Sequence, residues 1–178
     1  ETTNWIPAWG EDRIRGMLEH RPDWCISRQR VWGVPIPALN CTECGDVLLH
    51  EDVANRLADL ADEEGVDSWF KRDIADLVPE HIKCASCGAS RDAFERERDI
   101  LDVWFESGAS FAAVLERRGG FEAQADLYLE GSDQHRGWFQ SSLLIGVGSR
   151  DHAPFKSVLT HGFVVDEQGH QGAARGGE

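Results

Sequence analysis

Four of the five cysteines form two C-x2-C pairs, and a glycine directly follows each pair. These cysteines are Cys41, Cys44, Cys84 and Cys87. Two such knuckles supply four thiolates, which is the ligand set of a closed, structural Zn²⁺ site without a position for water. Two disulfides, or four ordinary buried thiols, are the alternatives. The adjacent glycines and the absence of a visible targeting peptide favour zinc.

A second polar group follows an expected strand at 125–131. Glu130 and Asp133 place two carboxylates there, and carboxylates suit the vicinal hydroxyls of a ribose. Ligands of open parallel sheets bind beyond the carboxyl ends of the strands. Gln134 and Trp138 are four residues apart, so on a helix they offer one polar group and one aromatic wall on a shared face. An ordinary helix cap followed by a core tryptophan is the alternative.

The elements that must position these residues are predicted from apolar spacing and from Gly and Pro. We expect helices at 11–20, 51–61 and 66–77, the last with Trp69 and Phe70 packing inward, and a short strand at 23–27. Cys25, in an apolar run, is expected to be a buried thiol. Ser132 is expected to cap a helix to Ile145, between strands at 125–131 and 155–162. The last three elements predict a parallel sheet.

The composition limits the class of protein. The chain has 178 residues, 41% of them hydrophobic, and a net charge of −14. This length fits one domain, or one domain with a small inserted module. Clustered Lys and Arg are needed for phosphate contacts, so an acidic chain is a poor general nucleic-acid binder. No apolar run reaches the length of a membrane span. With the paired cysteines, these features predict a cytoplasmic monomer.

Five segments, read together, resemble the bacterial-type isoleucyl-tRNA synthetases, which are class I enzymes. They occur in the family's order and are Trp5–Gly10, Arg21–Pro37, Asp102–Gly108, Tyr128–Leu143 and Leu159–Asp166. The resemblance implies an α/β fold: part of a Rossmann-like parallel sheet with a small inserted zinc-binding α+β module. It divides the chain into a catalytic-domain segment (1–37), the zinc-binding insertion (38–92), a Rossmann-like half (93–170) and a divergent tail (171–178).

The resemblance also implies roles for individual residues. Glu130, Gly131 and Asp133 would hold the ribose of ATP and of the aminoacyl-adenylate. The stretch formed by His161, Gly162 and Phe163 would run past the adenine. Isoleucine would meet Gln134 at its polar end and Trp104 and Trp138 along its side chain. ATP, Mg²⁺, isoleucine and tRNA(Ile) would be the substrates and partners of the whole enzyme. One methylene separates isoleucine from valine, so a separate editing site is implied.

Two signatures of the family are absent from these residues. They are the His-Ile-Gly-His turn and the Lys-Met-Ser-Lys-Ser loop, and after His170 the chain diverges from the family's sequence. Both signatures handle phosphates, and charge stabilisation is usually the largest catalytic term. The expected function is therefore that of a fragment of an isoleucine–tRNA ligase, inactive alone. The alternatives are a standalone zinc-ribbon binding module and a fragment of the related valine–tRNA ligase.

Overall fold

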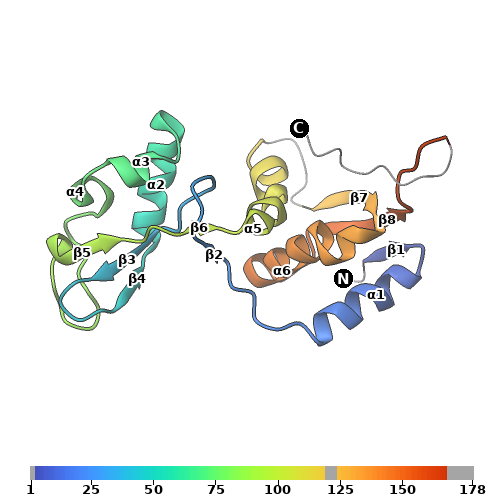
Figure 1. Ribbon diagram of the computed structural model, residues 1–178, viewed down its shortest axis with the longest axis horizontal. Helices are drawn as coiled ribbons and strands as arrows, with labels where there is room; N and C mark the ends of the chain where they lie inside the picture. The colour runs from blue at the N-terminus through green and yellow to red at the C-terminus, as the bar shows by residue number, and fades with distance from the viewer. Residues whose placement is uncertain (1–2, 119–123, 168–178) are drawn as a thin grey trace. The chain divides into compact units, whose positions relative to one another are not determined.

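The computed structural model describes residues 3–118 and 124–167. Two compact units divide the chain (Figure 1). Residues 25–102 form one of them, here called the cysteine unit. The described residues before and after it form the other, here called the sheet unit. Across the described ranges, no helix is long and apolar enough to cross a membrane. The divergent tail expected at 171–178 lies outside the described residues.

The sheet unit contains three parallel strands in the order β1-β8-β7 (Figure 1). Their bounds are Asn4–Ile6 for β1, Ala125–Gly131 for β7 and Phe155–His161 for β8. Helix α6 (Trp138–Arg150) joins β7 to β8. The core of the unit contains Tyr128, Phe139, Phe155 and Val158. The predicted strand–helix–strand unit with parallel pairing is confirmed.

Two further helices belong to this unit. Helix α1 (Trp9–Glu19) follows β1, and α5 (Val103–Gly108) is followed by a π-helical turn at Ala112–Glu116. Gly108 allows α5 to approach α6 closely, because a Cβ at this position would lie 2.8 Å from the carbonyl carbon of Ser141. A side chain at position 108 would therefore push the two helices apart.

The continuous helix expected from Ser132 to Ile145 is wrong. Residues 132–136 form a 3₁₀ turn, the backbone is non-helical at Gly137, and α6 begins at Trp138. The Ser132 side chain caps neither segment. The side-chain oxygen of Gln134 accepts the Trp138 amide at 2.9 Å instead. Gly137 thus separates a 3₁₀ turn from a 13-residue α-helix, and the Gln134 side chain caps the start of that helix.

The cysteine unit is built on a three-stranded antiparallel sheet in the order β4-β3-β5 (Figure 1). These strands are β3 (Ala38–Cys41), β4 (Val47–Leu49) and β5 (Phe94–Arg96). Helices α2 (Glu51–Glu64), α3 (Ser68–Lys71) and α4 (Ile74–Leu77) follow β4. A short 3₁₀ turn at Arg91–Ala93 precedes β5. Buried apolar residues from the sheet and the helices form one core, among them Leu39, Val53, Leu57, Leu60, Trp69, Leu77, Val78, Ile82 and Phe94.

Two of the predictions for the helices of this unit have different outcomes. Helix α2 is confirmed, and Gly65 follows it at a positive φ of 85°. The single helix expected at 66–77 is instead two one-turn helices with an interruption at residues 72–73. Trp69 is fully buried as expected, and its indole N–H donates to the Glu97 carbonyl at 2.8 Å. Phe70 is 41% exposed, because a one-turn helix presents only one of two successive residues to the core.

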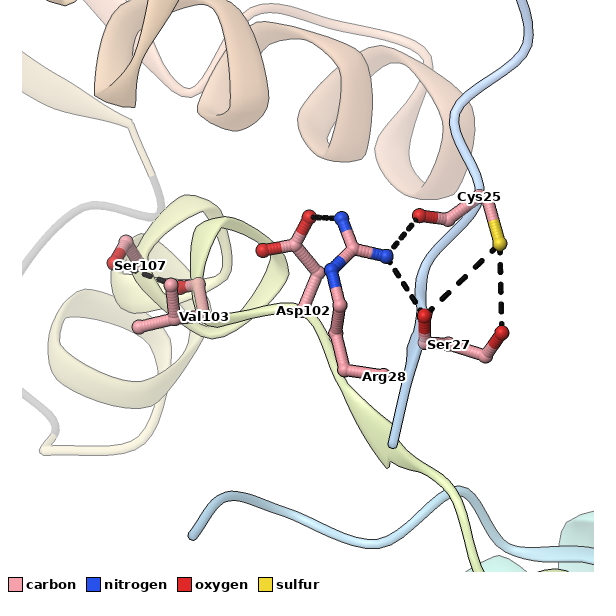
Figure 2. Close-up of polar contacts among 6 residues, drawn as sticks. All are labelled: Cys25, Ser27, Arg28, Asp102, Val103 and Ser107. Carbon is pink, nitrogen blue, oxygen red and sulfur yellow. Dashed lines mark hydrogen bonds and ion pairs between the residues drawn. The ribbon is translucent and has the colours of Figure 1, made fainter. Parts of the chain in front are cut away.

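The entry and exit segments of the cysteine unit pair with each other. Strands β2 (Ser27–Arg28) and β6 (Ile100–Leu101) are antiparallel, and the Asp102 amide donates to the Ile26 carbonyl at 2.7 Å. Figure 2 shows the Arg28 guanidinium paired with the Asp102 carboxylate, which is only 7% exposed. The same guanidinium donates to the carbonyl of Cys25 at 2.6 Å. These bonds fix the two ends of the unit to one another.

Two predictions near this junction are wrong. The strand expected at 23–27 is reduced to the pair Ser27–Arg28, since residues 23–26 have no ladder partner. Cys25 is exposed rather than buried, with its sulfur 3.4 Å from the Ser27 hydroxyl (Figure 2). Apolar character alone does not bury a residue in a connecting segment.

Candidate functional site

The four paired cysteines converge in the cysteine unit. Their sulfur atoms all lie within 4.8 Å of one another, and no disulfide joins them. Cys41 Sγ is 3.7 Å from Cys87 Sγ, and Cys44 Sγ is 3.5 Å from Cys84 Sγ. Metal–sulfur bonds of about 2.3 Å in a tetrahedron place sulfur atoms roughly 3.8 Å apart. The four thiols therefore have the spacing of a metal site.

The two knuckles are built in the same way. The amide of the residue four positions after the first cysteine donates to that cysteine's carbonyl, from Gly45 to Cys41 and from Gly88 to Cys84, at 2.8 Å in both cases. Both glycines have positive φ, 77° and 75°, which a residue with a Cβ adopts only with strain. The glycine after each pair is thus required for the turn that aims both thiols at one point.

The proton affinity of the clustered thiols is uneven. Although backbone hydrogen bonds oppose it, neighbouring thiols and burial raise the pKa of Cys44 to about 12 and also raise the pKa of Cys87, whereas the pKa of Cys84 is lowered. Hydrogen bonding by the Cys87 backbone is the largest influence on Cys84 and lowers the pKa of this thiol to about 7, although burial opposes it. Metal ligation requires thiolates, and amides that stabilise a thiolate reduce the competition from protons. Residues Cys41, Cys44, Cys84 and Cys87 can together hold a metal ion.

A second candidate site lies in the sheet unit, where β7 and β8 end side by side. Glu130 is in register with Thr160, and Gly131 with His161. Asp133 follows in the 3₁₀ turn, and its Oδ1 would lie 2.7 Å from a Cβ at Gly131. A side chain at position 131 would therefore displace the Asp133 carboxylate. The sheet register brings the two segments expected to hold ribose and adenine to one edge.

These residues are open to solvent. Glu130 and Asp133 are exposed, as are Gly162 and Phe163, the latter 54% exposed. His161 is half-buried, and its Nδ1 lies 2.5 Å from the Gly162 carbonyl. The edge thus presents carboxylates, backbone and an aromatic ring. Such groups can hydrogen-bond hydroxyls and stack on a flat base.

The residues expected to contact the amino acid lie beside this edge. A Cβ at Gly137 would approach the Gln134 Oε1 to 2.6 Å and the Trp104 ring to 3.0 Å, so these three residues are adjacent. Trp104 is 44% exposed. Gln134 is already used locally, because its oxygen accepts the Trp138 amide and its nitrogen donates to Asp133 Oδ2 at 3.2 Å. Its side chain therefore links Asp133 to the start of α6.

Trp138 is part of the core as well as of this neighbourhood. Its ring stacks on Tyr128 with a centroid distance of 4.0 Å and an interplanar angle of 9°. The indole N–H donates to the Ser107 carbonyl at 3.0 Å. Burial raises the pKa of Tyr128, which stays a neutral partner in this stack. Trp138 is therefore held rigidly between β7 and α5.

Sequence reasoning missed three residues near Trp104. Arg21, Trp24 and Gln140 line a small cavity of about 50 Å³ together with Trp104, Arg136, Gly137 and Ser141. Arg21 donates to the buried Gln140 side chain and lies over the Trp24 ring at 5.3 Å. Arg21 stands in a segment that carries the family resemblance, but its residue type and its position before a proline indicated no role. Only the packing of the segment before the cysteine unit reveals it.

Comparison with known families identifies the class of protein. The model of the class I tRNA synthetases (I, L, M and V) matches residues 1–175. The chain belongs to this family. The parallel sheet agrees with the α/β fold that the sequence predicted.

Curated isoleucine–tRNA ligases match nearly the whole chain. An isoleucine–tRNA ligase of Geobacter sulfurreducens is 56% identical over 171 residues, which are 96% of this chain and 18% of that protein. One from Syntrophotalea carbinolica is 58% identical over 93% of this chain and 18% of its own length. One from Aquifex pyrophilus is 56% identical over 96% of this chain and 32% of its own length. The chain thus spans about a fifth to a third of these relatives.

A solved structure shares the fold. It is a LeuRS of Agrobacterium radiobacter in a ternary complex with tRNA and LeuAMS, with a TM-score of 0.50 and 21% identity. The match covers 92% of this chain and 23% of that one.

Proposed function

We propose that this chain is the part of an isoleucine–tRNA ligase that holds the adenosine and the side chain of isoleucyl-adenylate and carries a structural zinc ion. The identity of 56–58% to curated isoleucine–tRNA ligases over nearly the whole chain carries this proposal. In the complete enzyme, the reaction joins isoleucine to tRNA(Ile) with ATP and Mg²⁺.

The strand ends support the adenosine assignment. Glu130 and Asp133 offer carboxylates to the ribose hydroxyls, and charge-assisted hydrogen bonds of this kind are stronger than neutral ones. Gly131 leaves room for the Asp133 carboxylate beside the backbone, and the His161–Phe163 segment, one strand away, would contact the adenine.

The tryptophans support the amino-acid assignment. Trp104 is partly exposed beside Gly137, and Trp138 follows directly in the chain, so both flank one glycine. A branched aliphatic side chain would gain free energy by burying its surface against these rings. Gln134 would then face the polar end of the amino acid from its fixed position at the start of α6.

Zinc is the metal that best suits the cysteine site. Four thiolates in a tetrahedron are the ligands of structural zinc, and the site leaves no open position. Cys84→Ser should remove the metal and unfold the cysteine unit, because metal binding and folding are coupled in such sites. Thr42→Ser, in the first knuckle between Cys41 and Cys44, is the control, because it changes no ligand. Metal analysis that finds no zinc in folded wild-type protein would refute the assignment.

A titration with non-hydrolysable aminoacyl-adenylate analogues tests the proposed ligand. The isoleucyl analogue should bind more tightly than the valyl analogue, since the extra methylene is worth about 1 kcal/mol or more in an apolar pocket. A preference for the valyl analogue would favour the valine–tRNA ligases. Zinc content without binding of any adenylate would favour a zinc-binding module.

A further inference from the structure

His135 is the most enclosed polar residue near the proposed ribose edge. Its side chain is 0% exposed. Three aromatic rings surround it: Trp5 at a centroid distance of 5.9 Å, Trp9 at 5.6 Å and Phe139 at 5.3 Å. Helix α1 closes the remaining side, because a Cβ at Gly10 would lie 3.3 Å from Nε2.

The two ring nitrogens have different surroundings. Nδ1 lies 3.0 Å from the carbonyl oxygen of Ser132, and Nε2 has no hydrogen-bond partner. A carbonyl can only accept, so Nδ1 carries the proton and Nε2 is a bare lone pair. An unsatisfied buried acceptor costs free energy, and a structure retains one where something else is gained.

We propose that His135 is a positioning residue that holds the ribose-binding turn, through the bond from Nδ1–H to the Ser132 carbonyl. That carbonyl belongs to the peptide plane that leads into Asp133. Fixing the plane fixes the direction in which the Asp133 backbone leaves the strand end. The cage of three aromatic rings fixes the imidazole itself. Through the imidazole, the turn is therefore anchored to β1, α1 and α6.

The cage also explains why the imidazole stays neutral. Burial among apolar rings lowers the pKa of His135, and the charge of Arg13 acts in the same direction, although the Ser132 carbonyl opposes them. A protonated ring would place a second N–H, on Nε2, beside Gly10, and no acceptor among the described residues lies within hydrogen-bond distance of Nε2. The neutral ring with its proton on Nδ1 is the form that both sides of the cage accept.

Two variants separate the hydrogen bond from the bulk of the ring. An asparagine amide places an N–H where Nδ1 lies, whereas a glutamine amide places it nearer to Nε2. We expect His135→Asn to hold the isoleucyl-adenylate analogue about tenfold more tightly than His135→Gln, corresponding to one net hydrogen bond. Melting curves of both variants report their shared loss of ring packing. Equal affinities in equally folded variants would overturn the proposal.

The ligand part of this test rests on the proposed function, and a second measurement does not. Long-range ¹H–¹⁵N spectra of the wild-type ring should show the proton on Nδ1. The Gly137 and Trp138 amides, both bonded to Gln134, should exchange with solvent roughly five- to tenfold faster in His135→Gln than in His135→Asn. A ring protonated on Nε2, or equal exchange, would contradict the positioning role. Failure of the wild type to bind any adenylate would contradict the proposed function alone.

Discussion

Asp133 combines exposure with a fixed backbone, which suits a charge that must meet a ligand. Its carboxylate has the Gln134 amide as a partner and keeps further lone pairs toward solvent. The carboxylate packs against Gly131, where a Cβ would lie 2.7 Å from its Oδ1, so any other residue there would displace it. The carboxylate that the sequence singled out is thus available at the edge where β7 and β8 end.

Asp133→Ala should weaken the isoleucyl-adenylate analogue roughly 10- to 100-fold, because a hydrogen bond to a charged group contributes about 1.5–3 kcal/mol. Asp126→Ala is the matched control. Asp126 lies on β7, the strand that leads into the turn of Asp133, and pairs with Lys156 at 2.9 Å on the surface, so its loss removes the same charge away from the proposed site. Isothermal titration checks both. Equal weakening in the two variants would indicate long-range electrostatics instead of a ribose contact.

The lowered pKa of His135 leads us to expect that the free energy of unfolding depends on pH. This pKa is lowered in the folded state, so the unfolded chain binds the proton more readily. The folded state should lose stability as pH falls below about 6.5, the ordinary pKa of histidine, and the loss continues down to the folded-state pKa.

Urea denaturation of wild type and His135→Phe between pH 7.5 and 5 measures this contribution as the difference between the two proteins. The wild type should lose more stability on acidification. A constant difference across the range would show that His135 does not titrate differently on folding.

Helix α6 carries the clearest contrast at the scale of an element. A Cβ at Gly146 would lie 2.7 Å from the Pro154 ring and 3.0 Å from the His152 carbonyl, whereas a Cβ at Gly148 would have nothing within 4 Å. Gly146 is therefore a contact between α6 and the segment before β8, and Gly148 is only a poor helix former.

Gly146→Ala should destabilise the sheet unit by about 1–3 kcal/mol through overpacking. Gly148→Ala should stabilise it by up to about 1 kcal/mol, because alanine has the higher helix propensity. Thermal unfolding of the two single variants decides between packing and propensity. Similar shifts of Tm in both would show that the close contact at Gly146 relaxes without cost.

The elements show what patterns in the sequence can and cannot predict. The parallel pair β7 and β8 and the helix α2 followed directly from apolar spacing and glycine. The break at Gly137 did not, because the glutamine that caps α6 acts from within the preceding turn. Residue types identified the cysteine cluster and the edge carboxylates. The enclosure of His135 depends on Trp5 and Trp9, which are distant in sequence and meet it only in the fold.

At the scale of the whole molecule, the sheet unit is discontinuous in sequence and the cysteine unit is not. Strand β1 pairs with β8, so Ile6 meets Leu159 across 153 positions of the chain (159 − 6). The 78 residues from 25 to 102 lie within that span, and their ends are joined by β2, β6 and the Arg28–Asp102 pair. The cysteine unit can complete its own pairing before residue 103 is needed.

The pairing of the two ends of the cysteine unit should also affect how fast the sheet unit folds. Once they have closed, the loop that joins β1 to β8 is effectively about half as long, which lowers the entropic cost of closing it by roughly 0.6 kcal/mol. Refolding of the sheet unit, followed by hydrogen-exchange protection of the β7 and β8 amides, should be about threefold faster with metal-loaded protein than with protein refolded in chelator. Equal rates would mean that the two units fold without regard to each other. In a chain made from its N-terminus onward, β1 waits unpaired until β8 is synthesised, and a cysteine unit that has already closed would shorten the loop between them.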